Sequence, residues 1–99
     1  VIGRINGWTL GAGLEVAAAC DMRIAADTAK FGMPEVRVGI PSVVEAALLP
    51  GLIGWGRTRR LLLLAEIIDA AEAERWGLVE RVVTPAALDA AVEEALAHL

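Results

Sequence analysis

Apolar residues at the start of the chain predict a buried strand that leads into a short helix. Val1, Ile2 and Ile5 form an apolar run, which indicates a strand. A glycine-punctuated turn follows, and the alanine-rich segment 12–20 predicts a helix. Polar and apolar residues then alternate over residues 21–26, which predicts a half-buried strand. After a turn at Asp27 and Thr28, residues 29–32 predict another short strand.

Helical patterns dominate the second half of the chain. Ser42 and Glu45 form a capping-box signature, and the helix that they begin is interrupted at Pro50 and Gly51. After a break at residues 54–56, the segment 57–68 predicts a helix that is mostly apolar and therefore buried on most sides.

The last third of the chain carries clear helix boundaries. Asp69 and Glu72 form a second capping signature, and Gly77 is expected to end the helix that follows. Residues 78–83 predict a strand, and Thr84 with Pro85 predicts the start of a final helix. One apolar stripe at spacings of three and four indicates that this helix packs by one face; it comprises Leu88, Ala91, Val92, Ala95, Leu96 and Leu99.

Length and composition limit the stability of this chain. A chain of 99 residues forms one domain at most, and it buries only about 60–65% of its unfolded surface. Hydrophobic residues make up 57% of it, which favours a core segment that other parts of a fold cover. The chain also opens inside a strand-like run without a methionine. We therefore expect a fragment of a larger fold.

Charge and cysteine usage exclude several function classes. Nine basic and 13 acidic residues give a net charge of −4, so a nucleic-acid partner is not expected. The apolar run at residues 61–65 is far too short to span a membrane. The single Cys20 has no partner for a disulfide or a metal site, which favours a cytoplasmic protein without a metal.

The turn before the first helix is the first candidate for chemistry. Gly11 and Gly13 permit backbone angles that other residues avoid, and the first N–H groups of the helix point outward as a potential oxyanion site. Glu15 lies in the first helical turn, where the helix dipole stabilises a carboxylate. Ordinary dipole compensation explains the same pattern without any function. Val16 stands where a dinucleotide-binding motif requires a third glycine, so the turn is not expected to bind a dinucleotide.

A second carboxylate follows a proline. Pro34 restricts its own φ and the conformation of Met33, so Glu35 is held on a stiff loop edge. Rigid loop carboxylates are candidates for catalysis. Glu35 alone also fits a solvated surface acid.

Four motifs together resemble the enoyl-CoA hydratase/isomerase (crotonase) family. They are Asn6-Gly7, Leu10-Gly11-Ala12-Gly13-Leu14-Glu15, Ala19-Cys20-Asp21-Met22-Arg23-Ile24-Ala25 and Ala29-Lys30-Phe31-Gly32-Met33-Pro34-Glu35. The resemblance covers nearly the whole chain. It implies an α/β, ClpP/crotonase-like spiral of ββα units. Residues 1–54 would form the C-terminal part of the crotonase core, and residues 55–99 a helical extension used in oligomerisation.

The resemblance also implies roles for individual residues. Glu15 and Glu35 match the two glutamates with which the family's hydratases move protons as water adds to a 2-enoyl-CoA thioester. The N–H of Ala12 would be one oxyanion donor, while the other lies upstream in the family, so residues 1–99 alone are expected to be inactive. The positions expected at the oxyanion and substrate site are Leu10, Gly11, Ala12, Gly13, Pro34 and Ser42.

The reaction and the assembly are less specific expectations. Two carboxylates favour hydration, with an isomerase, an acyl-CoA hydrolase or lyase, and a non-catalytic acyl-CoA-binding or assembly protein as alternatives. Val43 and Val44 stand where many hydratases of the family have a glycine-rich turn, and these larger side chains would reshape the pocket for the acyl group. Coenzyme A is expected only as part of the substrate, with no separate cofactor. The family resemblance implies a homotrimer or hexamer.

Overall fold

The computed structural model describes residues 1–34 and 48–99. Its first half contains β1 (Ile2–Ile5), β2 (Trp8–Leu10), α1 (Ala12–Ala19), β3 (Met22–Ala26) and β4 (Lys30–Gly32). Its second half contains α2 (Leu49–Ile53), α3 (Trp55–Leu63), β5 (Ile67–Asp69), α4 (Ala70–Trp76), β6 (Arg81–Val83), the 3₁₀ turn η3 (Pro85–Ala87) and α5 (Leu88–Ala97).

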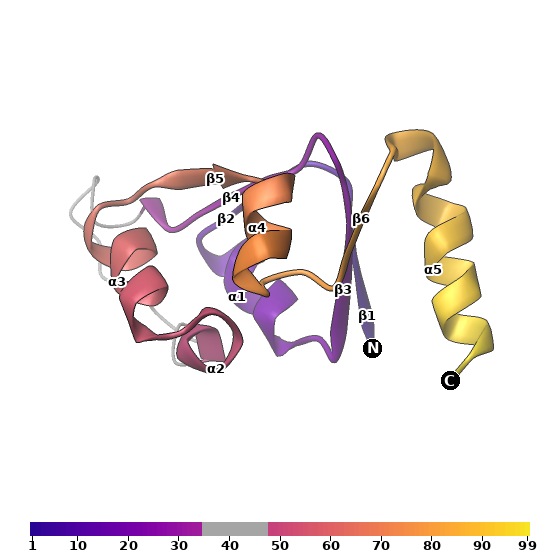
Figure 1. Cartoon of the computed structure of the whole chain (residues 1–99), viewed down its shortest axis with the longest axis horizontal. Helices are drawn as coiled ribbons and strands as arrows, with labels where there is room; N and C mark the ends of the chain where they lie inside the picture. Colours follow the sequence, from indigo (N-terminus) through magenta and orange to yellow (C-terminus); the bar gives the residue numbers. More distant parts are fainter. Residues whose placement is uncertain (35–47) are drawn as a thin grey trace.

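The strands form two small sheets. The first has the order β1-β3-β6 and is parallel throughout, whereas the second has the order β2-β4-β5. In the second sheet β4 runs parallel to β2 and antiparallel to β5. The molecule is elongated, 41 × 23 × 20 Å, with α2 and α3 at one end and α5 at the other (Figure 1). The α/β class expected from the sequence is confirmed.

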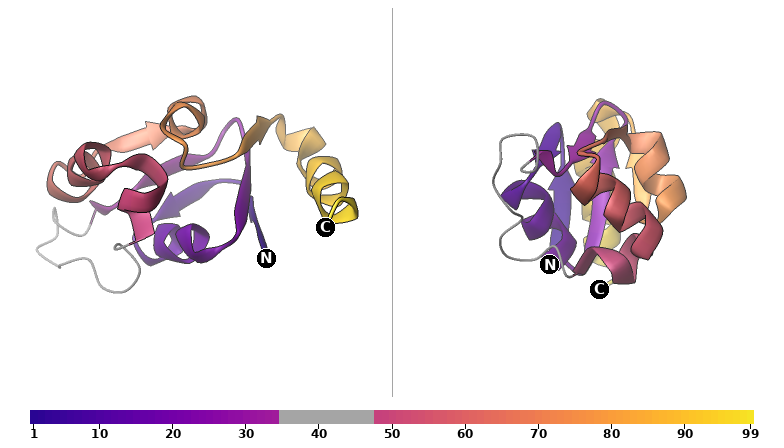
Figure 2. Two further views of the ribbon diagram at one scale, coloured as in Figure 1. Left: turned by 60° about the horizontal axis from the view of Figure 1, so that its bottom comes forward. Right: turned by 90° about the vertical axis from the view of Figure 1, so that its left-hand side faces the viewer.

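Helices cover both faces of the first sheet. Ile24 and Ala26 of β3 pack with Leu88 and Ala91 of α5 in a small apolar cluster. Ala25 instead belongs to the main core, together with Leu14 of α1 and Phe31 of β4, which is the largest fully buried side chain of the described residues. The left view of Figure 2 shows α5 lying apart from the other helices, beyond the first sheet.

This two-sided covering corrects one expectation. The alternating pattern predicted that residues 21–26 form a half-buried strand, but Arg23, Ile24, Ala25 and Ala26 are all buried. Parallel strands are usually covered on both faces, and here the polar position is buried because hydrogen bonds satisfy it.

The structure of residues 57–68 also differs from the single helix that the sequence predicts. The helix α3 already begins at Trp55 and ends at Leu63, and Ala65 then adopts a left-handed φ of 52°. The chain continues as strand β5, which pairs with β4. Only Thr58 and Leu61 of α3 are buried, so the expected burial on most sides is wrong.

Several boundaries differ by a few residues. Pro50 stands in the first turn of α2 rather than interrupting a helix, while Ser42 and Glu45 lie outside the described residues. The strand expected at residues 78–83 begins at Arg81, and α5 begins only after η3.

The pairs β4–β5 and β3–β6 join residues from both sides of the expected domain boundary at residue 54, and the division itself stays a prediction.

Candidate functional site

The turn between β2 and α1 has the geometry that its glycine predicts. Gly11 has φ 54° and ψ −124°, which a residue with a Cβ adopts only with strain. Its N–H donates to the carbonyl of Gly32 at 3.0 Å, so the turn is tied to the end of β4. Gly13 lies within α1 and has no positive φ, so the expectation of an unusual backbone angle there was wrong.

The start of α1 presents backbone donors beside open space. The N–H of Glu15 donates to the carbonyl of Gly11 at 3.0 Å and closes the first turn of the helix. The N–H groups of Ala12, Gly13 and Leu14 precede that bond and have no acceptor within the helix itself. Ala12 and Gly13 are exposed, and a Cβ added to Gly13 would meet nothing within 4 Å. A ligand oxygen therefore has room to approach this helix start.

Glu15 belongs to the same helical turn as these donors and is almost completely buried. Its residue exposure is 2%, and it belongs to the first turn of α1, as the sequence predicts. A buried carboxyl group beside outward backbone donors can exchange a proton with a ligand that those donors hold.

The pairing of β2 with β4 brings the second candidate segment to the same place. The two strands are parallel, and Leu10 is the register partner of Gly32. Their carboxyl ends therefore lie at one edge, where α1 begins and where Met33 and Pro34 leave β4. Met33 is buried and Pro34 is half-buried. Glu35 and Ser42 lie outside the described residues, so the meeting of Glu15 and Glu35 stays a prediction.

A cavity of about 250 Å³ lies beside the same helix. It is bordered by β1, β2 and one face of α1; the lining residues are Gly3, Arg4, Ile5, Asn6, Trp8, Thr9, Gly13, Val16, Ala17 and Cys20. Of the expected site positions that the structure describes, Gly13 lines it.

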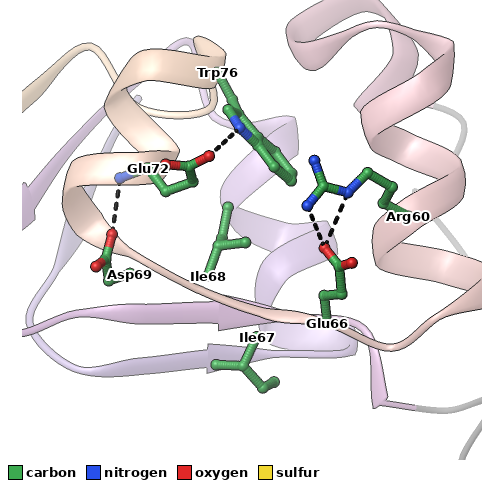
Figure 3. A pocket seen from close by; sticks show the side chains of 7 residues that line it. All are labelled: Arg60, Glu66, Ile67, Ile68, Asp69, Glu72 and Trp76. Atoms are coloured by element: carbon green, nitrogen blue, oxygen red, sulfur yellow. Dashed lines mark hydrogen bonds and ion pairs between the residues drawn. The ribbon is translucent and has the colours of Figure 1, made fainter.

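A larger cavity of about 500 Å³ was not expected from the sequence. Figure 3 shows its lining side chains, which come from α3, the connection that precedes β5, β5 itself and α4: Arg60, Glu66, Ile67, Ile68, Asp69, Glu72 and Trp76. The sequence signal for it is the acidic capping pair, Asp69 and Glu72, close to a tryptophan.

The polar groups of this larger cavity bind one another. Arg60 forms an ion pair with Glu66 at 3.0 Å, and its guanidinium lies 5.1 Å from the ring centre of Trp76. The indole N–H of Trp76 donates to Glu72 at 2.8 Å. Arg75 also binds Glu72, and together these donors hold the pKa of that carboxyl below its usual range. The network connects α3 to α4, so we assign these polar groups a structural role in holding the two helices together.

Neither a metal cluster nor a membrane-spanning helix occurs in the described ranges. Within residues 1–34 and 48–99, histidine, cysteine, aspartate and glutamate nowhere gather in a group that could hold a metal ion. In the same ranges no helix has the length and apolar character needed to cross a bilayer.

Comparison with known proteins shows one consistent relationship. The family model described as enoyl-CoA hydratase/isomerase matches residues 1–99. The crotonyl-CoA hydratase of Syntrophomonas wolfei is 51% identical over 86 residues, which are 86% of this chain and 33% of that protein. The short-chain-enoyl-CoA hydratase of Clostridium acetobutylicum is 46% identical over 89 residues, 89% of this chain and 34% of that protein.

Solved structures agree with the sequence relationship. The enoyl-CoA hydratase from Mycobacterium avium superposes with a TM-score of 0.95 at 38% identity, over 99% of this chain and 44% of that one. The enoyl-CoA hydratase from Bacillus anthracis gives 0.93 at 42% identity, over 96% and 37%. This chain thus spans about a third of the length of the curated relatives that it matches.

Proposed function

The chain belongs to the enoyl-CoA hydratase/isomerase family, and from this premise we propose that the whole protein adds water to a 2-enoyl-CoA thioester. The observation that carries the proposal is the arrangement at the start of α1. The exposed residues Ala12 and Gly13, whose N–H groups begin the helix, share the first turn of α1 with the buried Glu15. The names of the relatives, crotonyl-CoA hydratase and short-chain-enoyl-CoA hydratase, support the same reaction.

In the proposed reaction, the oxygen of water forms a bond to the β-carbon while a proton is delivered to the α-carbon. Negative charge develops on the thioester oxygen as the enolate forms. The N–H of Ala12 would donate to that oxygen, and a preformed backbone donor of this kind contributes about 3 kcal/mol to the transition state. The family resemblance implies a glycine at this position; the methyl group of Ala12 would narrow the path of the substrate to the N–H, but the donor itself would be retained.

Two carboxyl groups would share the proton transfers. Glu15 lies on α1, and Glu35 follows the proline after β4, whose end is bound to the turn of α1 through Gly11 and Gly32. One carboxylate would accept a proton from the attacking water while the other, protonated, supplies the α-carbon. Leu10 and Pro34 would flank the acyl group, and Ser42 would contribute to substrate binding.

The remaining parts of the proposal concern the cofactor, the oligomeric state and the location of the enzyme. Coenzyme A would enter as part of the substrate, with no separate cofactor. We also propose a homotrimeric or hexameric assembly in the cytoplasm, with residues 55–99 contributing to contacts between subunits.

The decisive experiment compares two glutamine variants in the whole protein with crotonyl-CoA as substrate. Glu15→Gln and Glu35→Gln each remove a proton-transfer group but preserve size, so kcat is expected to fall by about 10²- to 10⁴-fold, with a much smaller change in KM. Glu74→Gln on the exposed side of α4 is the matched control and should retain full turnover.

Product analysis completes this test. The expected product is the 3-hydroxyacyl-CoA thioester, formed with uptake of one water. A product with a shifted double bond, formed without uptake of water, would show that the reaction is isomerisation and not hydration. Full turnover in both glutamine variants would show that neither carboxyl group takes part in the proton transfers.

A further inference from the structure

The helix α1 ends without the usual local means of closing a helix. Its last residue is Ala19, and Cys20 follows in the extended conformation, with φ −70° and ψ 155°, where many helices have a left-handed glycine. The last turn of α1 contains no basic residue. The N–H of Cys20 donates to the carbonyl of Ala17 at 3.1 Å. The other carbonyls at this end of the helix therefore need donors from elsewhere in the fold.

Arg23 of the neighbouring strand β3 supplies these donors. Its Nη1 group donates to the carbonyl of Cys20 at 2.6 Å, to that of Ala17 at 3.1 Å and to that of Ala18 at 3.4 Å. Its Nε group donates to the carbonyl of Leu78 at 2.8 Å. Because only 3% of the side chain is exposed, water cannot readily take the place of these bonds.

The charge of Arg23 also suits this position. The last carbonyls of a helix give its C-terminus negative character, so a guanidinium there is favourable. Glu80 holds the arginine in place, because it accepts from the backbone N–H of Arg23 at 2.6 Å and forms an ion pair with the guanidinium at 3.3 Å. Since Leu78 and Glu80 both lie between α4 and β6, the guanidinium is fixed relative to the first sheet.

The apolar contacts of α1 define its position along the helix axis only weakly. Its buried apolar side chains are Leu14, Ala17 and Ala18, and only the first of them is large. An alanine side chain makes few atom contacts, so it does little to prevent a helix from sliding past its neighbours. Hydrogen bonds at the two ends of α1 therefore set its position: the N–H of Gly11 is bonded to the end of β4, and Arg23 binds the last carbonyls.

A movement of α1 along its axis would displace the candidate oxyanion donor. Ala17 lies five positions after Ala12, which is about 8 Å along a helix. A helix this short transmits a displacement of its last turn to its first turn, which contains Ala12 and Glu15. A donor stabilises an oxyanion only at about 2.7–3.1 Å from the oxygen. A misplacement of about 1 Å can therefore slow the reaction by about 10²-fold.

We propose that Arg23 is a positioning residue for the reaction. Its hydrogen bonds to the last carbonyls of α1 hold the helix where the N–H of Ala12 and the carboxyl group of Glu15 meet the substrate thioester. This inference rests on the hydration reaction proposed above, and it adds a residue that acts on the substrate only through α1. A purely structural arginine would affect how much protein is folded, whereas a positioning arginine also affects the rate of each folded molecule.

Two substitutions in the whole protein test this role with crotonyl-CoA as substrate. Arg23→Lys keeps the charge but has one nitrogen in place of the guanidinium fork, so it cannot bind the carbonyls of α1 and of Leu78 together. Its kcat per folded molecule is expected to fall by about 10-fold, with KM changed by less than about 3-fold. Arg23→Met removes every donor of the side chain and should lower kcat by about 10²-fold. If the methionine variant does not fold, the lysine variant decides the test.

Leu88→Ala is the matched control for lost stability. Leu88 is buried in the apolar cluster between β3 and α5, whereas the buried apolar side chains of α1 belong to the main core. The alanine leaves a cavity in that cluster and should lower the melting temperature of the protein, as the Arg23 variants do. Because α1 keeps its hydrogen bonds, the kcat of each folded molecule should not change.

The carbonyl stretch of a bound thioester reports the position of the donor directly. Butyryl-CoA with a ¹³C label at the thioester carbonyl has no double bond to hydrate, so it binds without reacting. A hydrogen bond to its carbonyl oxygen polarises the C=O bond and lowers the stretching frequency in the infrared spectrum. We expect a smaller shift on binding to the Arg23→Lys variant than to the unsubstituted protein, and the full shift with Leu88→Ala.

The outcomes separate this inference from the hydration proposal. A protein that hydrates crotonyl-CoA, and in which Arg23→Lys retains both kcat and the carbonyl shift, would overturn the positioning role and leave hydration standing. A protein that fails to hydrate crotonyl-CoA would contradict the hydration proposal, while the carbonyl shift would still decide the role of Arg23. Equal losses of kcat in Arg23→Lys and Leu88→Ala would overturn the positioning role, as would an unsubstituted protein that shows no carbonyl shift.

Discussion

At the scale of single residues, Arg23 is the most heavily bonded polar side chain of the described molecule. It stands on β3 with only 3% of its side chain exposed. Its guanidinium donates to the carbonyls of Leu78 at 2.8 Å and Cys20 at 2.6 Å, and more weakly to that of Ala17 at 3.1 Å. An ion pair with Glu80 adds to these bonds. One side chain therefore ties the end of α1, which begins at the candidate site, to the segment between α4 and β6.

Replacing Arg23 by methionine should lower the free energy of unfolding by about 3–5 kcal/mol, because buried carbonyl groups lose their donor while Glu80 loses its partner. Urea denaturation of the whole protein measures this loss. Glu80→Gln is the comparison, since Glu80 is 36% exposed and can be solvated; its cost should stay near 1 kcal/mol. Equal effects of the two substitutions would show that the ion pair, and not the carbonyl bonds, accounts for the stability.

At the scale of elements, the position of β5 depends on a glycine in β4. Gly32 is paired with Leu10 on one side and with Ile67 on the other. A Cβ at Gly32 would lie 2.5 Å from the end of the Ile67 side chain and 3.1 Å from the carbonyl oxygen of Glu66. The close approach of β5 therefore requires glycine at this position, next to the hydrogen bond that Gly32 forms with Gly11.

Gly32→Ala should destabilise the protein by about 1–3 kcal/mol, because the backbone at Glu66 must move away even if Ile67 changes rotamer. Gly51→Ala in the short helix α2 is the matched control: its Cβ would meet nothing within 4 Å, and alanine is the better helix former. We expect a lower melting temperature for the first variant and an unchanged or higher one for the second. A neutral Gly32→Ala would mean that β5 can shift without cost.

At the scale of the whole molecule, the chain is stabilised by two clusters of apolar side chains on either side of the first sheet. Val1, Trp8 and Val16 remain largely exposed around β1, β2 and α1. The family resemblance implies that a second oxyanion donor would lie upstream of the turn at Gly11, and the chain covers 33% of the length of the crotonyl-CoA hydratase of Syntrophomonas wolfei. Catalysis by the proposed route needs both donors.

Residues 1–99 alone are therefore expected to show no measurable hydration of crotonyl-CoA. Loss of one oxyanion donor costs about 3 to 4 kcal/mol of transition-state stabilisation, which is a factor of several hundred in rate. A coupled absorbance assay on the isolated chain and on the whole protein makes the comparison, with equal amounts of folded protein. Turnover comparable to that of the whole protein would place the complete site within these residues.

The sequence by itself determined the features that depend on neighbours three or four residues apart. The helix after the glycine turn is confirmed, with Glu15 in its first turn. The cap of α4 is also confirmed: Asp69 accepts from the N–H of Glu72 at 2.8 Å, and Gly77 ends the helix with a left-handed φ of 83°. Such boundaries are predictable because a side chain or a glycine satisfies a backbone requirement locally.

Only the tertiary structure decided which short segments become strands and which polar groups are buried. The strands β2 and β5 have three residues each, too few to show a period, and both exist because β4 offers its two edges. The end of α3 carries no signal either, since Ala65 takes a left-handed conformation that sequence patterns associate with glycine or asparagine. Arg23 is buried because carbonyls distant in sequence surround it. Contacts of this kind are made between separated segments, so no local pattern records them.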